Sequence, residues 1–202
     1  MEVTKREVRM SKVQLPTGEE PRKGFESLAA MDSGDEFRVD CVFVSQLAVI
    51  ELSEINMMRQ EAFSNVSTLT GLTNELISFE QEINLLPGKT TSDKVLFRAY
   101  KGNVLTGYAL VVIGWPEQGE WVLQHLVINP EYRLQGIGSK IVEKVETFAL
   151  RSEVASDRMF AIPLEEKGAI FWQNHGYRIE SSRQLVKIAD LDHELVVYRK
   201  DL

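Results

Sequence analysis

One segment constrains the fold of this chain more than any other: the stretch VINPEYRLQGIGSKIV, residues 127–142. An apolar run ends at Asn129, Arg133 follows, and Gly136 and Gly138 open a run with helical periodicity. A strand that turns into a helix leaves unpaired backbone N–H groups and a positive dipole end at the turn. Glycines let an anion approach that backbone closely. The segment therefore predicts either a phosphate site or a tight turn without a ligand.

Two common phosphate motifs do not fit this segment. A dinucleotide fingerprint needs a third glycine at position 141, which is Ile141 here. A P-loop needs Gly-Lys-Ser or Gly-Lys-Thr, whereas residues 138–140 read Gly-Ser-Lys. Arg133 supplies a charge-assisted donor and Ser139 a hydroxyl in the first helical turn, so an anion remains the favoured ligand.

The hydrophobic patterns predict one mixed α/β domain after a polar N-terminal arm. Residues 1–36 are polar and interrupted by proline and glycine, which indicates an arm or partly flexible extension. Helical periodicity predicts helices within residues 51–63, 73–86, 139–149 and 165–177. Runs rich in β-branched and aromatic residues predict strands within residues 37–47, 94–101, 104–113, 120–128, 158–164, 184–191 and 194–202. This order indicates a single domain over residues 37–202, built around one sheet.

Composition limits the classes of partner. The chain has 202 residues and a net charge of −7, which argues against a nucleic-acid interface because such interfaces need a basic face. No apolar run approaches the roughly 20 residues that span a bilayer, and the charged start does not resemble a secretion signal. We therefore expect no membrane contact and a cytoplasmic location. Cys41 is the only cysteine, so neither an intrachain disulfide nor a multi-cysteine metal site is expected.

Two segments together give the chain its resemblance to a known family. Residues 130–138 read PEYRLQGIG, a strand-to-helix pattern of Pro-x-x-Arg followed by Gln/Arg-x-x-Gly-x-Gly/Ala. Residues 171–177 read FWQNHGY, a helix that ends in two aromatics, three residues, glycine and an aromatic. In this order the segments resemble those of the GCN5-related N-acetyltransferases (GNAT), and the resemblance covers roughly residues 37–200. It implies a GNAT-like fold, acetyl-CoA as co-substrate and no metal.

The resemblance also implies where the co-substrate would bind. The backbone amides from Leu134 to Ser139 would hold the pyrophosphate, and the pantetheine arm would pair with Leu126 to Ile128 like an added strand. A backbone N–H of that strand would polarise the thioester carbonyl. Trp172 would form a wall of the acyl-CoA slot or part of the core. The expected cofactor-binding residues are Leu126, Val127, Ile128, Arg133, Leu134, Gln135, Gly136, Ile137, Gly138, Ser139 and Trp172.

The catalytic residues are harder to predict. Family members often carry a Glu or His base on the strand before the phosphate turn, but the matching positions here are Val122 and Gln124, which cannot accept a proton. Glu120 shares their strand parity and would act through a water. Histidine changes charge near neutral pH, but in a regular strand His125 would face away from Gln124 unless a bulge reverses it. Gln124, Glu120 and His125 are the catalytic candidates.

The proton donor for the leaving thiolate departs from the family pattern. Many members carry a tyrosine on the late helix, where this chain has Trp172. Water, Tyr177 or Tyr198 would have to substitute, and the sequence does not choose between them.

The resulting hypothesis is an acetyl-CoA-dependent N-acetyltransferase that acts on a primary amine of a small molecule or peptide by direct attack in a ternary complex. One alternative keeps the fold but uses a longer acyl-CoA or an acyl carrier protein as donor. A second alternative is a non-catalytic acyl-CoA-binding sensor, which the absent base and absent tyrosine favour. The resemblance also allows a homodimer, because relatives often dimerise through their closing strands.

Overall fold

The helices and strands follow one another in nearly the order that the hydrophobic patterns predict. The computed structural model describes residues 37–63, 78–85, 93–152, 156–161, 163, 168–180, 184–188 and 191–202. These residues belong to one unit of the chain, Met31–Leu202. The predicted N-terminal arm, residues 1–36, lies outside the described residues.

The described helices and strands are, in chain order, β1 (Arg38–Phe43), the 3-10 helix η1 (Val44–Gln46), α1 (Val49–Phe63), α3 (Phe79–Leu85), β2 (Lys94–Lys101), β3 (Val104–Ile113), β4 (Glu120–Ile128), the 3-10 helix η3 (Pro130–Tyr132), α4 (Ile137–Arg151), β5 (Arg158–Ala161), α5 (Gly168–Asn174), β6 (Arg178–Ile179), β7 (Gln184–Ile188), β8 (Leu191–Leu195) and β9 (Tyr198–Asp201).

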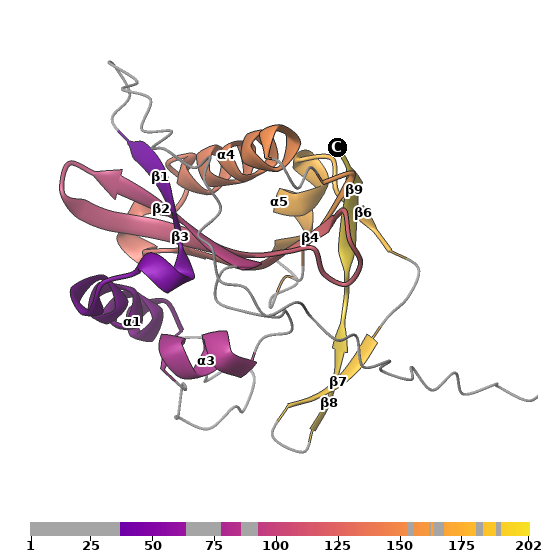
Figure 1. The fold of residues 1–202 in the computed structure, drawn as a ribbon, viewed down its shortest axis with the longest axis horizontal. Helices are drawn as coiled ribbons and strands as arrows, with labels where there is room; N and C mark the ends of the chain where they lie inside the picture. The colour runs from indigo at the N-terminus through magenta and orange to yellow at the C-terminus, as the bar shows by residue number, and fades with distance from the viewer. Residues whose placement is uncertain are drawn as a thin grey trace, which may run out of the picture. The chain divides into compact units, whose positions relative to one another are not determined.

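One sheet organises the unit. Its strand order is β1-β2-β3-β4-β5-β9-β6, and every neighbouring pair is antiparallel except β4–β5, which is parallel. The parallel pair requires a crossover, which α4 provides between the two strands (Figure 1). The structure confirms the predicted mixed α/β fold with a mostly antiparallel sheet flanked by helices.

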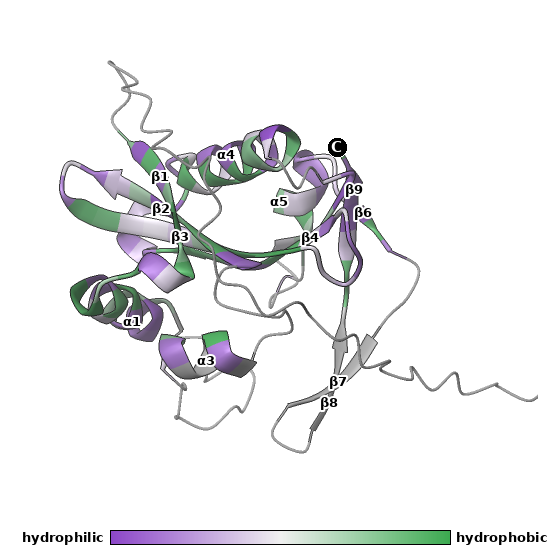
Figure 2. Ribbon diagram, viewed as in Figure 1, coloured by the Kyte–Doolittle hydropathy of each residue, from purple (hydrophilic) through white to green (hydrophobic). Residues whose placement is uncertain are grey.

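Helices cover both faces of this sheet (Figure 1). On one face α4 buries an apolar stripe, and its Phe148 ring lies 5.4 Å from the Phe97 ring and 5.9 Å from the Trp121 ring. On the other face, Ile55 of α1 and Phe79 of α3 pack in a buried cluster against the central strands. Figure 2 shows hydrophobic residues concentrated on these central strands. The two layers explain why β2, β3 and β4 read as nearly continuous apolar runs.

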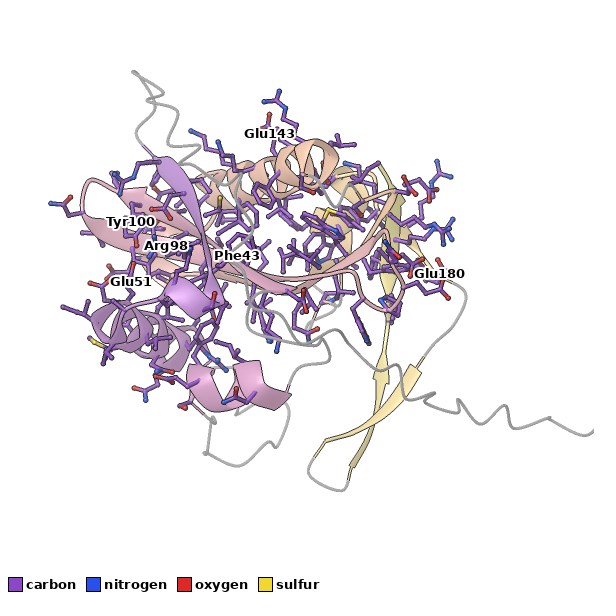
Figure 3. All side chains as sticks on the ribbon, in the orientation of Figure 1. Phe43, Glu51, Arg98, Tyr100, Glu143 and Glu180 are labelled. Atoms are coloured by element: carbon purple, nitrogen blue, oxygen red, sulfur yellow. The ribbon has the colours of Figure 1, made fainter. Side chains whose placement is uncertain are left out.

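A partly buried charge network attaches α1 to the sheet edge. The Arg98 guanidinium on β2 donates to Asp40 of β1 at 2.8 and 3.2 Å, and it also contacts Glu51 in the first turn of α1. Glu51 accepts a further bond from the Ala48 backbone N–H at 2.7 Å. Figure 3 shows Arg98 and Tyr100 beside the start of α1, where Glu51 lies. The network holds the beginning of α1 against β1 and β2.

The closing strands differ from the prediction. Residues 184–188 and 191–195 pair with each other in a separate two-stranded sheet, and only Tyr198–Asp201 joins the main sheet from the predicted strand 194–202. Hydrophobic patterns identify extended segments but carry no information on their pairing partners, which explains the difference. The N-terminal part of the predicted helix 73–86 lies outside the described residues, and α3 begins at Phe79.

Candidate active site

The turn between β4 and α4 forms a cradle of backbone amides. After β4 the chain makes the short helix η3, and the Asn129 side chain caps it by accepting from the Glu131 N–H at 3.0 Å. Leu134 and Gly136 then adopt left-handed backbone conformations, with φ of 62° and 81°. Gly136 is the N-cap of α4 and, as a glycine, offers no side-chain cap to the first N–H groups of that helix.

These N–H groups suit an anion. The first turn of any helix lacks internal acceptors for its N–H groups, and the helix dipole adds positive potential there. Gly136 in the left-handed conformation directly precedes the helical Ile137, and such a turn can direct successive N–H groups into one anion-binding concavity. The nearest cation in sequence, Arg133, is anchored by an Nε–H bond of 3.2 Å to the Ile128 carbonyl. The predicted residues from Arg133 to Ser139 thus form one continuous turn into α4, and phosphate binding there stays a prediction.

Strand β4 separates from β5 just before this cradle. The parallel ladder pairs Glu120 to Leu123 of β4 with Arg158 to Ala161 of β5, and no strand among the described residues pairs with Leu126 to Ile128 on that side. The predicted pantetheine segment, Leu126 to Ile128, lies in this unpaired part. One edge of β4 is therefore available there for an extended ligand that adds to it like a strand.

Helix α5 lies close to the start of α4. A Cβ atom placed on Gly138 would lie 3.4 Å from the Phe171 ring and 3.8 Å from the Leu126 side chain. Phe171 thus marks one side of the region that contains the unpaired part of β4, although the sequence motif alone gave it no site role. Its neighbour Trp172 is 4% exposed and packs against Phe171 and Tyr177 with ring centroids 5.1 and 5.0 Å away. Trp172 is a core residue, and its contact with an acyl-CoA stays a prediction.

A β-bulge interrupts β4 at the candidate catalytic residues. Val111 of β3 lies opposite Leu123, but the next residue back along β3, Leu110, lies opposite His125, so Gln124 has no partner on β3. Residues directly opposite in a ladder share a face, and Leu110 belongs to the cluster with α1 and α3. The bulge therefore turns His125 to the face of α1 and α3, away from α4. The bulge that the sequence alone left open is therefore present, and it sets the face of His125.

Glu120 is a buried, paired carboxylate. It is 6% exposed, and its Oε1 accepts from Arg158 Nη1 at 2.8 Å. It begins β4, about 13 Å along the strand from Gln124 at the usual rise per residue. The contact with Arg158 joins β4 to β5 where their parallel ladder begins, which favours a structural role over a water-linked base.

The two tyrosines considered as proton donors are both buried. Tyr177 is 1% exposed, its hydroxyl lies 3.9 Å from the Met159 sulfur, and burial followed by the nearby Glu146 carboxylate raises its pKa. A raised pKa makes a phenol a poorer proton donor. Tyr198 is 3% exposed on β9. Neither observation assigns a donor for the thiolate.

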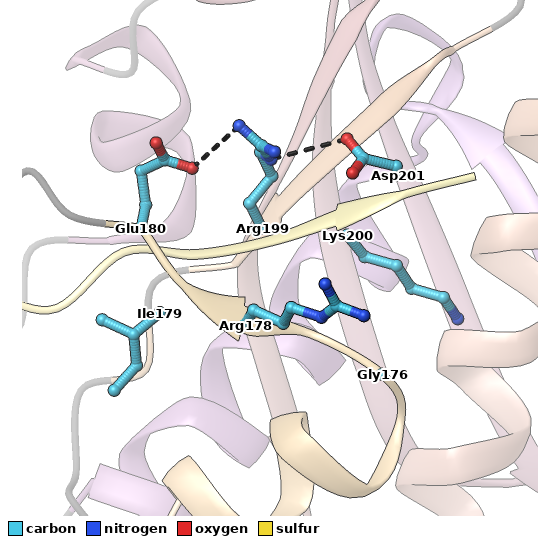
Figure 4. Close-up of a pocket in the computed structure, with 7 residues that line it drawn as sticks. All are labelled: Gly176, Arg178, Ile179, Glu180, Arg199, Lys200 and Asp201. Carbon is cyan, nitrogen blue, oxygen red and sulfur yellow. Dashed lines mark ion pairs between the residues drawn. The ribbon is translucent and has the colours of Figure 1, made fainter.

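A separate pocket of about 410 Å³ lies at the β6–β9 edge (Figure 4). Most of its charges are already paired: Arg199 contacts Glu180 at 3.2 Å and Asp201 at 3.5 Å. Lys200 contacts Glu146 of α4 at 2.7 Å. In Figure 4 Arg199 points with Glu180 and Asp201 to one side of β9 and Lys200 to the other. None of its lining residues belongs to the cradle or to the unpaired part of β4.

In the described part of the chain, no three His, Cys, Asp or Glu side chains are grouped as a metal site would require. None of its helices has the length and apolar character needed to cross a bilayer.

Comparison with known proteins points to one family. The chain matches the family described as the acetyltransferase (GNAT) family over residues 62–177, more than half of its length. A curated relative, thialysine N-epsilon-acetyltransferase of Sus scrofa, is 31% identical over 81 residues, which are 39% of this chain and 47% of the relative. The match thus spans about half the length of that relative.

Solved structures show the same fold. An acetyltransferase from Streptococcus agalactiae superposes with a TM-score of 0.60 at 16% identity, over 83% of this chain and 99% of the other. The PaiA N-acetyltransferase from Thermoplasma acidophilum, solved in complex with coenzyme A, gives 0.59 at 15% identity over 82% and 99%. The ribosomal-protein-S18-alanine N-acetyltransferase from Escherichia coli gives 0.58 at 12% identity over 82% and 93%.

Proposed function

Because the chain belongs to the acetyltransferase (GNAT) family, we propose that it transfers the acetyl group of acetyl-CoA to a primary amine. The observation that carries this proposal is the separation of β4 from β5 after Leu123, directly before the amide cradle of α4. The two features together suit a molecule with an extended amide-containing arm and a diphosphate, which is the chemistry of a CoA thioester.

Acetyl-CoA fits these features in one orientation. The diphosphate would occupy the cradle from Leu134 to Ser139, near Arg133, and the pantetheine amides would bond to the free edge of Leu126 to Ile128. The thioester would then lie near the bulge at Gln124. A backbone N–H of the same edge would donate to the thioester oxygen and stabilise its developing negative charge.

The proposed reaction is direct attack of the amine on the thioester carbon in a ternary complex. The C–N bond forms, the C–S bond breaks, and the amine loses one proton. His125 is the proposed base, because the bulge brings it onto the α1 and α3 face beside Gln124. Gln124 is proposed to position the amine. Glu120 takes second place, because Arg158 already holds its carboxylate.

The leaving group needs little help from the protein. A thiol ordinarily has a pKa of about 8.5, so CoA can leave as a thiolate and take its proton from solvent. This route removes the need for a tyrosine at position 172, where Trp172 packs in the core.

For the acceptor we propose an amine on a small molecule or a peptide, in line with the thialysine acetyltransferase among the relatives. The test is calorimetric titration with acetyl-CoA, CoA and a long-chain acyl-CoA, followed by thiol release against a panel of amino acids, polyamines and peptides. Tight acetyl-CoA binding with amine-dependent thiol release is expected. Binding without release would favour the sensor alternative, and tighter binding of the long-chain thioester would favour a longer acyl donor.

A further inference from the structure

Leu134 combines two unfavourable features at the edge of the cradle. Its φ is 62°, the only positive φ of a non-glycine residue among the described residues. Leucine in this left-handed region is strained because its Cβ approaches the following carbonyl oxygen. Its side chain is also fully exposed, with a relative exposure of 106%. Strained residues cluster at ligand sites, where the ligand benefits from the arrangement.

The exposure of the Leu134 side chain indicates which part of a bound CoA it could contact, the pantetheine arm or the nucleotide. The pantetheine arm is proposed to follow β4 toward Gln124, into the region between α4, α5 and the sheet. The Leu134 side chain extends into solvent, and nothing among the described residues covers it. With the pantetheine arm on β4, the part of CoA at the solvent side of the cradle would be the nucleotide, whose largest apolar surface is the adenine ring.

We infer that Leu134 is a specificity residue for the nucleotide end of the co-substrate, packing its side chain against the adenine ring. The inference rests on the proposed function. In this arrangement, the left-handed backbone directs the amide N–H groups at the diphosphate, and the leucine side chain covers one face of the neighbouring adenine ring. Burial of one such apolar contact corresponds to about a tenfold gain in affinity.

Three substitutions separate the contact from the backbone strain. Asparagine and glycine tolerate the left-handed conformation without an apolar side chain, whereas methionine keeps the apolar side chain. Leu134→Asn and Leu134→Gly are expected to bind CoA about tenfold more weakly, with Leu134→Met within about twofold of wild type. Because strain is relieved, the melting temperature of ligand-free Leu134→Asn is expected to rise by about 1 to 3 °C. Leu150→Gln, at the far end of α4 and 57% exposed, is the control and should leave CoA binding unchanged.

Calorimetry with two ligands identifies the part of CoA involved. Phosphopantetheine lacks the 3′-phosphoadenosine together with one phosphate of the diphosphate, so each Leu134 variant should bind it as tightly as wild type binds the same ligand. An equal loss for CoA and phosphopantetheine would overturn the adenine assignment, as would a Leu134→Asn variant that binds CoA like wild type. If the wild-type protein bound neither ligand, the proposed function would fall and this inference with it.

Discussion

His125 lies directly opposite Leu110 in the β3–β4 ladder, because a bulge at Gln124 shifts the register by one residue. Leu110 packs in the cluster with α1 and α3, so the imidazole belongs to that face of the sheet. The proposed base and the proposed diphosphate cradle thus lie near the two ends of the part of β4 that continues beyond its ladder with β5.

The first prediction concerns His125 as the base. His125→Gln should lower kcat by about 100- to 1000-fold and remove the rising limb of the pH–rate profile, because the amine would lose its proton acceptor. The affinity for acetyl-CoA should stay within about twofold, since the contacts proposed for this ligand are made by backbone amides away from the imidazole. Steady-state kinetics over pH and calorimetry measure the two effects.

A matched histidine control is His193→Gln on β8, which belongs to the separate two-stranded sheet. We expect it to retain wild-type kcat. A His125→Gln enzyme with unchanged kcat and pH profile would remove His125 from the mechanism.

The second prediction assigns Glu120 to stability. Glu120→Ala leaves Arg158 without its partner in the ladder between β4 and β5, so the free energy of unfolding should fall by about 1 to 3 kcal/mol. Urea denaturation measures this, with the exposed Glu117→Ala as a control that should change it by less than about 0.5 kcal/mol. Transfer activity per folded molecule should stay within about twofold. A large loss of kcat at full folding would return Glu120 to the catalytic set.

The third prediction uses two glycines with the same backbone constraint. Gly136 and Gly102 have φ of 81° and 58°, and an added Cβ would contact nothing within 4 Å at either position. A glutamate at either site should therefore cost a similar amount of stability. Only Gly136→Glu places a carboxylate at the start of α4, so it should weaken acetyl-CoA binding by more than about 100-fold. Equal affinities in Gly136→Glu and Gly102→Glu would disprove the cradle assignment.

The fourth prediction concerns acid stability at α1. The Ala48 backbone N–H, followed by Arg98, holds the pKa of Glu51 below its ordinary value of 4.5. A carboxyl group with a lowered folded pKa stabilises the fold above its ordinary pKa, and this stabilisation is lost as the pH falls below that value. Wild type should therefore lose more unfolding free energy than Glu51→Gln between pH 6 and pH 3. The difference should stay below about 1 kcal/mol and shrink in high salt, because Glu51 is partly exposed. Parallel slopes in thermal melts over pH would contradict this role.

Local patterns were sufficient for much of the fold. The apolar run of residues 120–128 predicts β4 with its observed bounds, and the stripe of α4 predicts the buried side that packs on Trp121 and Phe97. The cradle was also predictable, because a left-handed N-cap needs glycine and Gly136 stands there. These features depend on residues close together in the sequence, so local sequence patterns are sufficient to predict them.

Tertiary structure decided what depends on partners distant in the chain. Periodicity could not choose between a regular strand and a bulge at His125, and only the pairing with β3 reveals the bulge. The contact of Glu120 with Arg158 joins two residues that are neighbours only because β5 pairs with β4. Likewise, residues 184–188 read as a strand of the main sheet but pair elsewhere. The sequence by itself determined the elements and the cradle through local backbone preference, while register and pairing, which come from long-range packing, decided which side chains face the proposed acetyl donor.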